Sequence, residues 1–181
     1  TLSVGGRLSL RSFVTVTIPH VINRRGSKNM SGFGDAMITG HYTIVNPDIS
    51  RLWLPQVQVV GALKQGRATS IYDYKDPAKL GVLGNGVPEG RLGLDIWQGM
   101  TNWKLGFAQT MTIPLESRET PIGEYAQGPT FRATVTAGYG LKNGSKLIAG
   151  INRTRKWETQ LDRQELPQSD VVNLGYFVTG A

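Results

Sequence analysis

Ionisable and amide side chains recur at every second position in several segments of this chain, with apolar residues between them. Leu92, Leu94 and Ile96, for example, alternate with Arg91 and Asp95. Guanidinium, carboxylate and amide groups placed in this way select a water-borne solute by its charge, or pair with one another and fill an interior. Nine residues are predicted to share this polar side: Arg11, Asp35, His41, Gln56, Gln58, Arg91, Asp95, Lys104 and Arg132.

No arrangement of residues in the sequence indicates catalysis or metal binding. The chain has no Cys, which removes thiolate nucleophiles and Cys-based zinc sites. Its two histidines, His20 and His41, lie in different segments without the spacing of metal ligands. The glycines of Gly81–Gly86 are not followed by the Lys-Ser/Thr pair of a phosphate-binding loop. We therefore predict a protein that is not an enzyme and uses no cofactor or metal.

The alternation predicts β-strands, because successive side chains of a strand point to opposite faces. It is clearest in Trp103–Leu115, where large apolar residues alternate with Lys104, small residues and threonines. Eight strands are predicted, at residues 8–21, 33–45, 52–64, 90–98, 103–115, 130–141, 146–157 and 170–181. Residues 1–4 are expected to form a strand stub. Gly5-Gly6-Arg7 is then expected to form a tight turn, since glycine tolerates a positive φ.

Short and long connections alternate between these segments. Turns are predicted near Gly6, Pro47, Thr101 and Asn143, the last from an Asn-Gly pair that is typical of hairpins. The connections at 23–29, 65–89, 116–129 and 158–169 are long and polar. Outer-membrane barrels have short periplasmic turns and long outer loops. The pattern therefore predicts an all-β fold, an antiparallel up-and-down transmembrane β-barrel, as a single domain over residues 1–181.

Aromatic residues fall into two groups along the predicted strands. Near the short turns lie Trp53, Trp97, Trp103 and Tyr139. Toward the long connections lie Phe33, Phe131 and Trp157. Aromatic side chains form belts at both membrane–water interfaces of a barrel. We predict that the first group lies at a membrane interface, with the lipid bilayer and lipopolysaccharide as partners.

The net charge of +7 is compatible with a nucleic-acid partner. The basic residues are scattered and mostly lie near proposed loops, which favours solvated loops that face anionic headgroups. A soluble alternative stays open, because a β-sandwich also alternates, with its apolar face inward. In that case the chain is a soluble β-rich structural subunit, capsid- or tube-like, that assembles through its strands. Val14, Val16 and Leu105 then face a dry protein core instead of lipid.

A family resemblance supports the membrane alternative. The motif Ser31-Gly32-Phe33-Gly34-Asp35-Ala36 enters a predicted strand and follows a segment from Arg7-Leu8-Ser9-Leu10 to Ile18-Pro19-His20-Val21. In these motifs, and in the hairpins 90–114 and 130–155, the chain resembles the outer-membrane proteins of the phenol-degradation meta-pathway family. The resemblance implies an outer-membrane, transporter-like barrel for small molecules, small apolar compounds among them. Such proteins carry a signal peptide and more strands, so we expect the domain to be incomplete at both ends.

These patterns together predict a channel or transporter of the bacterial outer membrane, through which small-molecule solutes diffuse passively along a polar lumen. The interior of an eight-stranded barrel is just filled by side chains. Small residues such as Gly106 and Ala108 on the polar side predict a wider cavity, and hence a whole barrel of about ten to fourteen strands.

Overall fold

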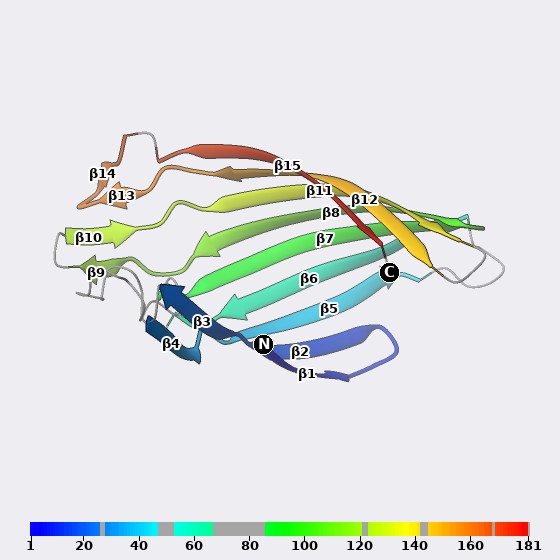
Figure 1. Ribbon diagram of the computed structural model, residues 1–181, viewed down its shortest axis with the longest axis horizontal. Coiled ribbons are helices and arrows are strands. Elements are labelled where there is room, and N and C mark those ends of the chain that lie inside the picture. Colours follow the sequence, from blue (N-terminus) through cyan, green and yellow to red (C-terminus); the bar gives the residue numbers. More distant parts are fainter. Residues whose placement is uncertain are drawn as a thin grey trace.

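The computed structural model describes residues 1–25, 28–46, 53–66, 86–120, 123–141, 145–167 and 169–180. Within these ranges no helix is long and apolar enough to cross a membrane. Nine described strands form one antiparallel sheet, here called the large sheet (Figure 1). In spatial order they are β1 (Leu2–Arg7), β2 (Ser12–Ile18), β5 (Met37–Val45), β6 (Gln56–Lys64), β7 (Glu89–Met100), β8 (Trp103–Pro114), β11 (Thr130–Gly140), β12 (Lys146–Lys156) and β15 (Val171–Gly180).

The longest strands occupy the middle of the large sheet and its β15 side. β7 and β8 each have 12 residues, and β11 and β12 each have 11. An extended run of this length spans about 36 Å, which is enough to cross the hydrocarbon core of a bilayer at a tilt. Threonine, isoleucine and aromatic residues recur among them, and these residue types pack well on a pleated sheet. The all-β antiparallel prediction is confirmed.

The large sheet is open within the described chain. Its edge strands are β1 and β15, and every two neighbouring strands in the spatial order are antiparallel. β2 pairs with β1 and β5, while β15 pairs with β12. The direct pairing of residues 8–21 with residues 170–181 that would close an eight-stranded barrel is therefore not formed among these residues. Among the described residues the large sheet has nine strands, where the sequence predicted eight for the barrel wall.

The ninth strand is β1, which was predicted only as a stub at residues 1–4 and continues to Arg7 for a local reason. Gly5, Gly6 and Arg7 were predicted to turn but continue the ladder, opposite Thr15, Val14 and Phe13. The chain reverses instead at residues 8–11, where the Ser9 hydroxyl accepts hydrogen bonds from the Arg11 and Ser12 N–H groups. A serine side chain that bonds backbone N–H groups two and three residues on stabilises a turn without glycine.

The predicted first strand and the loop after it are also corrected. Residues 8–21 do not form one strand, because β2 begins at Ser12 and ends at Ile18, and Pro19 separates it from the next strand. β3 (His20–Arg25) and β4 (Lys28–Phe33) then pair as a separate hairpin across the predicted loop. The Gly34 N–H donates to the Pro19 carbonyl at 2.8 Å and closes the base of this hairpin.

The long connections gather at one end of the large sheet and the short turns at the other (Figure 1). The β3–β4 hairpin lies at the long-loop end. A four-stranded sheet lies there too, made of β9 (Arg118–Thr120), β10 (Gly123–Ala126), β13 (Gln160–Leu161) and β14 (Gln164–Glu165). Only Thr101 and Asn102 connect β7 to β8 at the short-turn end. The predicted turns near Pro47 and Asn143 and most of the connection 65–89 lie outside the described residues.

The described residues contain almost no conventional core. Ala62, Val87 and Tyr125 are the hydrophobic residues that are buried in this part of the chain. Large apolar side chains are instead exposed along the strands, Val135 at 59% and Tyr176 at 89% among them. A soluble domain of this size buries most such side chains, so the large sheet leaves an extended apolar surface uncovered.

Candidate functional site

The strand register sorts the side chains of the large sheet onto two faces. Residues that lie opposite each other in an antiparallel ladder point to the same side. One such row joins Val57, Ile96, Phe107, Val135 and Ile151, and we call its side the apolar face. The next row along the strands points the other way, to what we call the polar face. It comprises Gln58, Asp95, Ala108, Thr134 and Asn152.

Charged residues lie almost entirely on the polar face. The nine strands carry eleven Asp, Glu, Lys and Arg residues. Two are on the apolar face, Arg153 and Arg155. The register puts the other nine, seven basic and two acidic, on the polar face: Arg7, Lys64, Glu89, Arg91, Asp95, Lys104, Arg132, Lys146 and Lys156. The polar face is therefore wet or internally paired, and strongly basic.

Seven of the nine predicted polar-side residues share the polar face: His41, Gln56, Gln58, Arg91, Asp95, Lys104 and Arg132. Arg11 lies in the turn before β2, outside the strands. It nevertheless lines a hollow of about 150 Å³ together with His41, Gln56 and Gln58. Asp35 lies in the connection between β4 and β5 and is buried.

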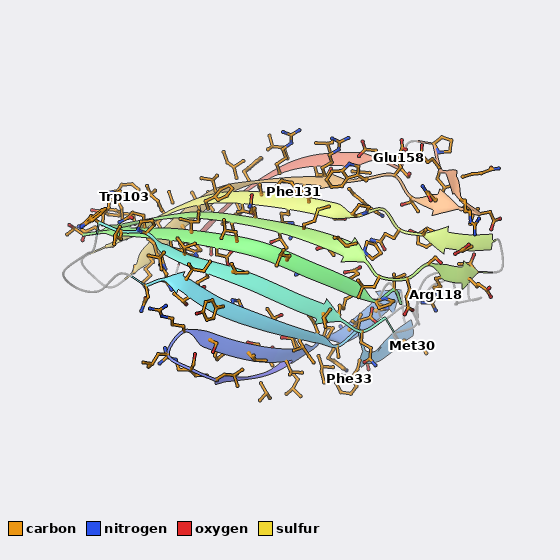
Figure 2. The ribbon with its side chains drawn as sticks, turned by 180° about the vertical axis from the view of Figure 1, so that it is seen from behind. Met30, Phe33, Trp103, Arg118, Phe131 and Glu158 are labelled. Atoms are coloured by element: carbon orange, nitrogen blue, oxygen red, sulfur yellow. The ribbon has the colours of Figure 1, made fainter. Side chains whose placement is uncertain are left out.

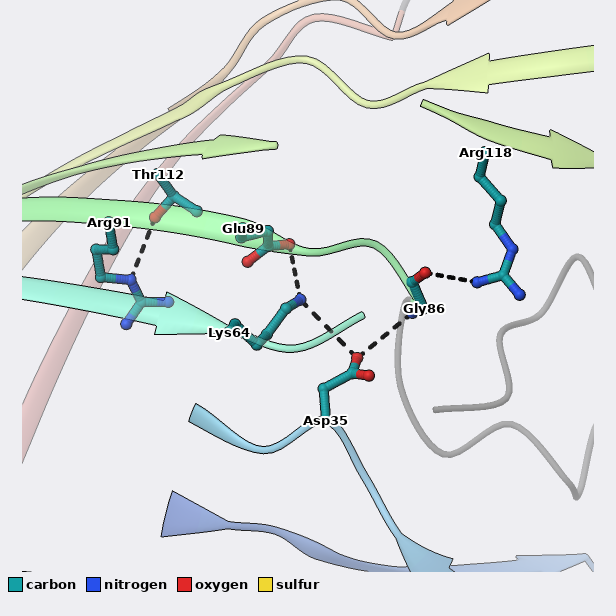
Figure 3. Close-up of polar contacts among 7 residues, drawn as sticks. All are labelled: Asp35, Lys64, Gly86, Glu89, Arg91, Thr112 and Arg118. Atoms are coloured by element: carbon teal, nitrogen blue, oxygen red, sulfur yellow. Dashed lines mark hydrogen bonds and ion pairs between the residues drawn. The ribbon is translucent and has the colours of Figure 1, made fainter. Parts of the chain in front are cut away.

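Asp35 belongs to a buried charge cluster at the long-loop end of the polar face (Figure 3). The Lys64 Nζ lies 2.8 Å from Glu89 Oε1 and 4.0 Å from Asp35 Oδ2. The Gly86 N–H donates to Asp35 Oδ2 at 3.4 Å, and Arg118 Nη1 donates to the Gly86 carbonyl at 2.7 Å. The cluster therefore ties the start of β7 to the end of β6 and to the loop before β5.

Beside this cluster two arginines point into a hollow of about 200 Å³. Arg91 Nε donates to Thr112 Oγ1, and Arg132 Nε donates to Thr154 Oγ1, each at 3.3 Å. Among the described residues neither arginine forms an ion pair. The hollow is lined by Glu89, Arg91, Thr110, Thr112, Gln127, Thr130 and Arg132.

The aromatic residues at the short-turn end divide between the two faces. Trp103 and Tyr139 lie opposite each other on the apolar face with ring centroids 4.8 Å apart. Trp97 was predicted to lie with them, but the register puts it on the polar face opposite Gln56 and Gly106. Lys104 Nζ lies 4.6 Å from the Trp97 ring centroid. The indole fills the space that Gly106 leaves, so Trp97 does not share a face with Trp103 and Tyr139.

The remaining aromatic predictions concern the two ends of the molecule. Trp53 lies just before β6 and is 75% exposed. Figure 2 shows Trp103 at the short-turn end, with Met30, Arg118 and Glu158 toward the opposite end. Phe33, also toward the long-loop end, is 64% exposed. Large rings are thus present on the surface near both ends of the strands.

Several polar-face residues were missed or undervalued by sequence reasoning. Glu89 was assigned to the irregular segment, although it stands two residues before Arg91 and therefore points to the same face of a strand. Arg7 was assigned to a turn. Gly86 and Arg118 enter the charge cluster through contacts across 32 residues of sequence, which no local pattern signals. In the described chain no group of three or more His, Cys, Asp or Glu is placed to hold a metal ion.

Comparison with solved structures finds a similar fold. The structure of this chain is similar to that of an outer membrane channel from Pseudomonas putida F1, with a TM-score of 0.77 and 15% sequence identity. The match covers 97% of this chain and 66% of that chain, so this chain spans 66% of the channel's length. No protein-family model matches the chain, and no curated protein matches it. At this identity the likeness establishes the fold: an antiparallel sheet like the wall of an outer membrane channel.

Proposed function

We propose that this chain forms most of the wall of a β-barrel channel in the bacterial outer membrane, through which small polar solutes diffuse passively. In this proposal the apolar face contacts lipid and the polar face lines a water-filled lumen. The short turns lie on the periplasmic side and the long connections outside. The role is that of a passive conduit and includes no catalytic step.

The separation of charge between the two faces carries the proposal. Nine charged residues lie on the polar face, while the apolar face carries two and exposes Leu92, Val135 and Ile151 by more than half. A charge on the lipid side of a barrel costs about 2–4 kcal/mol at the bilayer midplane, so that side excludes charges. In a soluble sheet, by contrast, the apolar face is covered by a second layer.

The two charged exceptions fit the same arrangement. Arg153 and Arg155 lie near the long-loop end of β12, and Arg155 Nη2 pairs with Asp170 Oδ2 at 3.2 Å. The Arg155 guanidinium also lies 5.2 Å from the Trp157 ring centroid. Arginine and tryptophan at this depth meet the interface, where anionic lipopolysaccharide headgroups attract basic groups.

Further strands would complete the barrel. Among the described residues β1 and β15 each pair with a strand on one side only, and unpaired strand edges are not tolerated in hydrocarbon. The similar channel is longer than this chain, which spans 66% of it. Nine strands over that share of a barrel correspond to a closed structure of about fourteen strands, within the range expected from the sequence.

Partition and conductance test this proposal. The protein is extracted from membranes, and its solubility is compared with and without detergent. It is then added to planar lipid bilayers in KCl. We expect solubility only in detergent and discrete conductance steps. A monodisperse protein in detergent-free buffer would instead support the soluble structural subunit. A detergent-dependent protein without conductance would retain the barrel but overturn the open channel.

A further inference from the structure

Two arginines of the polar face lie on either side of one strand and line one hollow. Arg91 is on β7 and Arg132 is on β11, with β8 between them. Strands two apart in a sheet are separated by about 10 Å, and the two arginines are offset by one row along the strands. Their side chains border a common space of about 200 Å³, together with Thr110, Thr112 and Thr130.

The hollow keeps a positive charge although Glu89 also lines it. Glu89 is bound to Lys64 at 2.8 Å, which offsets part of its charge, and the two arginines that line the hollow outnumber it. Within the described residues no carboxylate forms an ion pair with Arg91 or Arg132. Two guanidinium groups at one site that form no ion pair with a carboxylate of this part of the chain favour an anion from solution.

Hydrogen bonds to threonines orient the two guanidinium groups and leave their Nη donors available for such a ligand. The hydrogen bonds that orient these arginines use Nε, with Thr112 and Thr154 as acceptors. A guanidinium has four further N–H donors on its two Nη atoms. These form the planar fork that binds both oxygens of a carboxylate. The hydroxyls of Thr110 and Thr130 add neutral hydrogen-bonding partners around the fork.

We propose that Arg91 and Arg132 form a binding subsite for small organic monocarboxylates on the polar face, near its long-loop end. This inference rests on the proposed function, since it gives the channel a solute class. A monoanion is favoured over a dianion because the Glu89 carboxylate borders the hollow and repels added negative charge. The volume of about 200 Å³ suits a short-chain or single-ring acid. Binding must be weak for the solute to leave again.

Equilibrium binding tests the subsite independently of conduction. The detergent-solubilised protein is titrated with sodium propionate, and binding is followed by NMR saturation transfer to the ligand. Propionamide, which has the same shape but no charge, is the control ligand. We expect millimolar binding of propionate and no saturable binding of propionamide. Equal binding of the two ligands would overturn the proposal.

Variants locate the site. Arg91→Gln and Arg132→Gln are each expected to weaken propionate binding about tenfold, since each removes a charged hydrogen-bonding partner. Arg153→Gln makes the same change on the apolar face and should leave binding unchanged. Arg91→Lys keeps the positive charge but lacks the planar fork of donors, so its affinity for propionate should lie between those of the wild type and Arg91→Gln. Heat-modifiable electrophoretic mobility checks that each variant is folded.

Two further outcomes complete the test. Unchanged propionate binding in the folded Arg91→Gln and Arg132→Gln variants would overturn the subsite. Displacement of propionate by inorganic phosphate at lower concentrations than by acetate would overturn the preference for monocarboxylates. In planar bilayers, we expect the wild-type protein to conduct anions in preference to cations, and loss of this preference in both glutamine variants would link the subsite to conduction. Carboxylate binding by a protein that forms no conducting pore would retain the subsite while refuting the channel.

Discussion

The two faces of the large sheet are built from the same strands but obey opposite rules. On the apolar face, Leu92, Val135 and Ile151 are each exposed by more than half. The polar face carries nine charged residues. Some of them are paired, such as Lys64 with Glu89, and others are hydrogen-bonded to threonines, such as Arg91. Most charged residues of the strands therefore lie on one face, and the other face is mainly apolar. This contrast is the one that the proposed channel wall requires, with lipid on one side of the sheet and water on the other.

The comparison predicts that removing a paired charge from the polar face destabilises the folded protein. Lys64→Met should lower the free energy of unfolding by about 3–5 kcal/mol, because it leaves the Glu89 and Asp35 carboxylates close together without their shared cation. Urea titration of the protein folded in lipid vesicles measures the change. Lys146→Met, at an exposed position of the same face, is the control and should change stability little. A Lys64→Met variant as stable as the wild type would show that the cluster is not structural.

On the apolar face, by contrast, adding a charge should destabilise the folded protein. Val135→Arg places a guanidinium in the middle of β11 on that face and should cost about 2–4 kcal/mol in vesicles. The matched control is Thr134→Arg, one residue away on the polar face, where Asp95 lies in the same row. The control is expected to be nearly neutral. Equal losses for both variants would contradict the assignment of the faces.

A smaller effect concerns the close fit of Trp97 on the polar face. A Cβ added to Gly106 would overlap the Trp97 ring and lie 2.6 Å from Thr136 Oγ1. Gly106→Ala should therefore cost about 1–3 kcal/mol and shift the tryptophan fluorescence as the indole is displaced. Gly138→Ala, on the same face of the neighbouring strand, meets its nearest atom at 3.6 Å and serves as the control. An unchanged spectrum in Gly106→Ala would mean that Trp97 lies elsewhere.

The smallest expected effect lies outside both faces, in the long connection after β12. A hydrogen bond with Glu165, and then the negative charge of Glu165, raise the pKa of Glu158. For a carboxyl with a raised pKa, the stabilising contact is present at low pH and is lost as the pH rises through that pKa. Backbone hydrogen exchange of residues 161–165, corrected for intrinsic rates, should be slower at pH 4 than at pH 7. Glu158→Gln should remove most of this difference; a pH dependence that persists in it would have another origin.

The sequence was informative wherever one period governed a whole strand. Trp103–Leu115 was predicted almost to the residue, because its alternation matches the two faces that β8 presents. Seven polar-side residues were likewise placed correctly together by parity alone. The predictions failed where a local signal competed with that period. Gly5-Gly6 permits a turn but does not require one, and Ser9 supplied the hydrogen bonds for the actual reversal.

Trp97 and the charge cluster show what a single sequence leaves out. Trp97 lies near a turn, as interface aromatics do, yet its parity with Asp95 already put it on the polar side. Residue type and position disagreed there, and position was the better guide. Asp35 was expected to line a polar surface but is buried, because Lys64 and Gly86 reach it from segments remote in the chain. Such contacts depend on the register between strands, which alternation within one strand does not determine.

Solvent accessibility on the two faces tests the central claim most directly. The chain has no Cys, so single-cysteine variants can carry a nitroxide label without background. Ile151→Cys and Asn152→Cys are adjacent on β12 and point to opposite faces. In lipid vesicles, we predict that the label in Ile151→Cys is relaxed by oxygen and not by a water-soluble nickel chelate, and that the label in Asn152→Cys shows the reverse. Labels equally accessible to the nickel chelate, or a label in Ile151→Cys shielded from both reagents as in a protein core, would contradict the account.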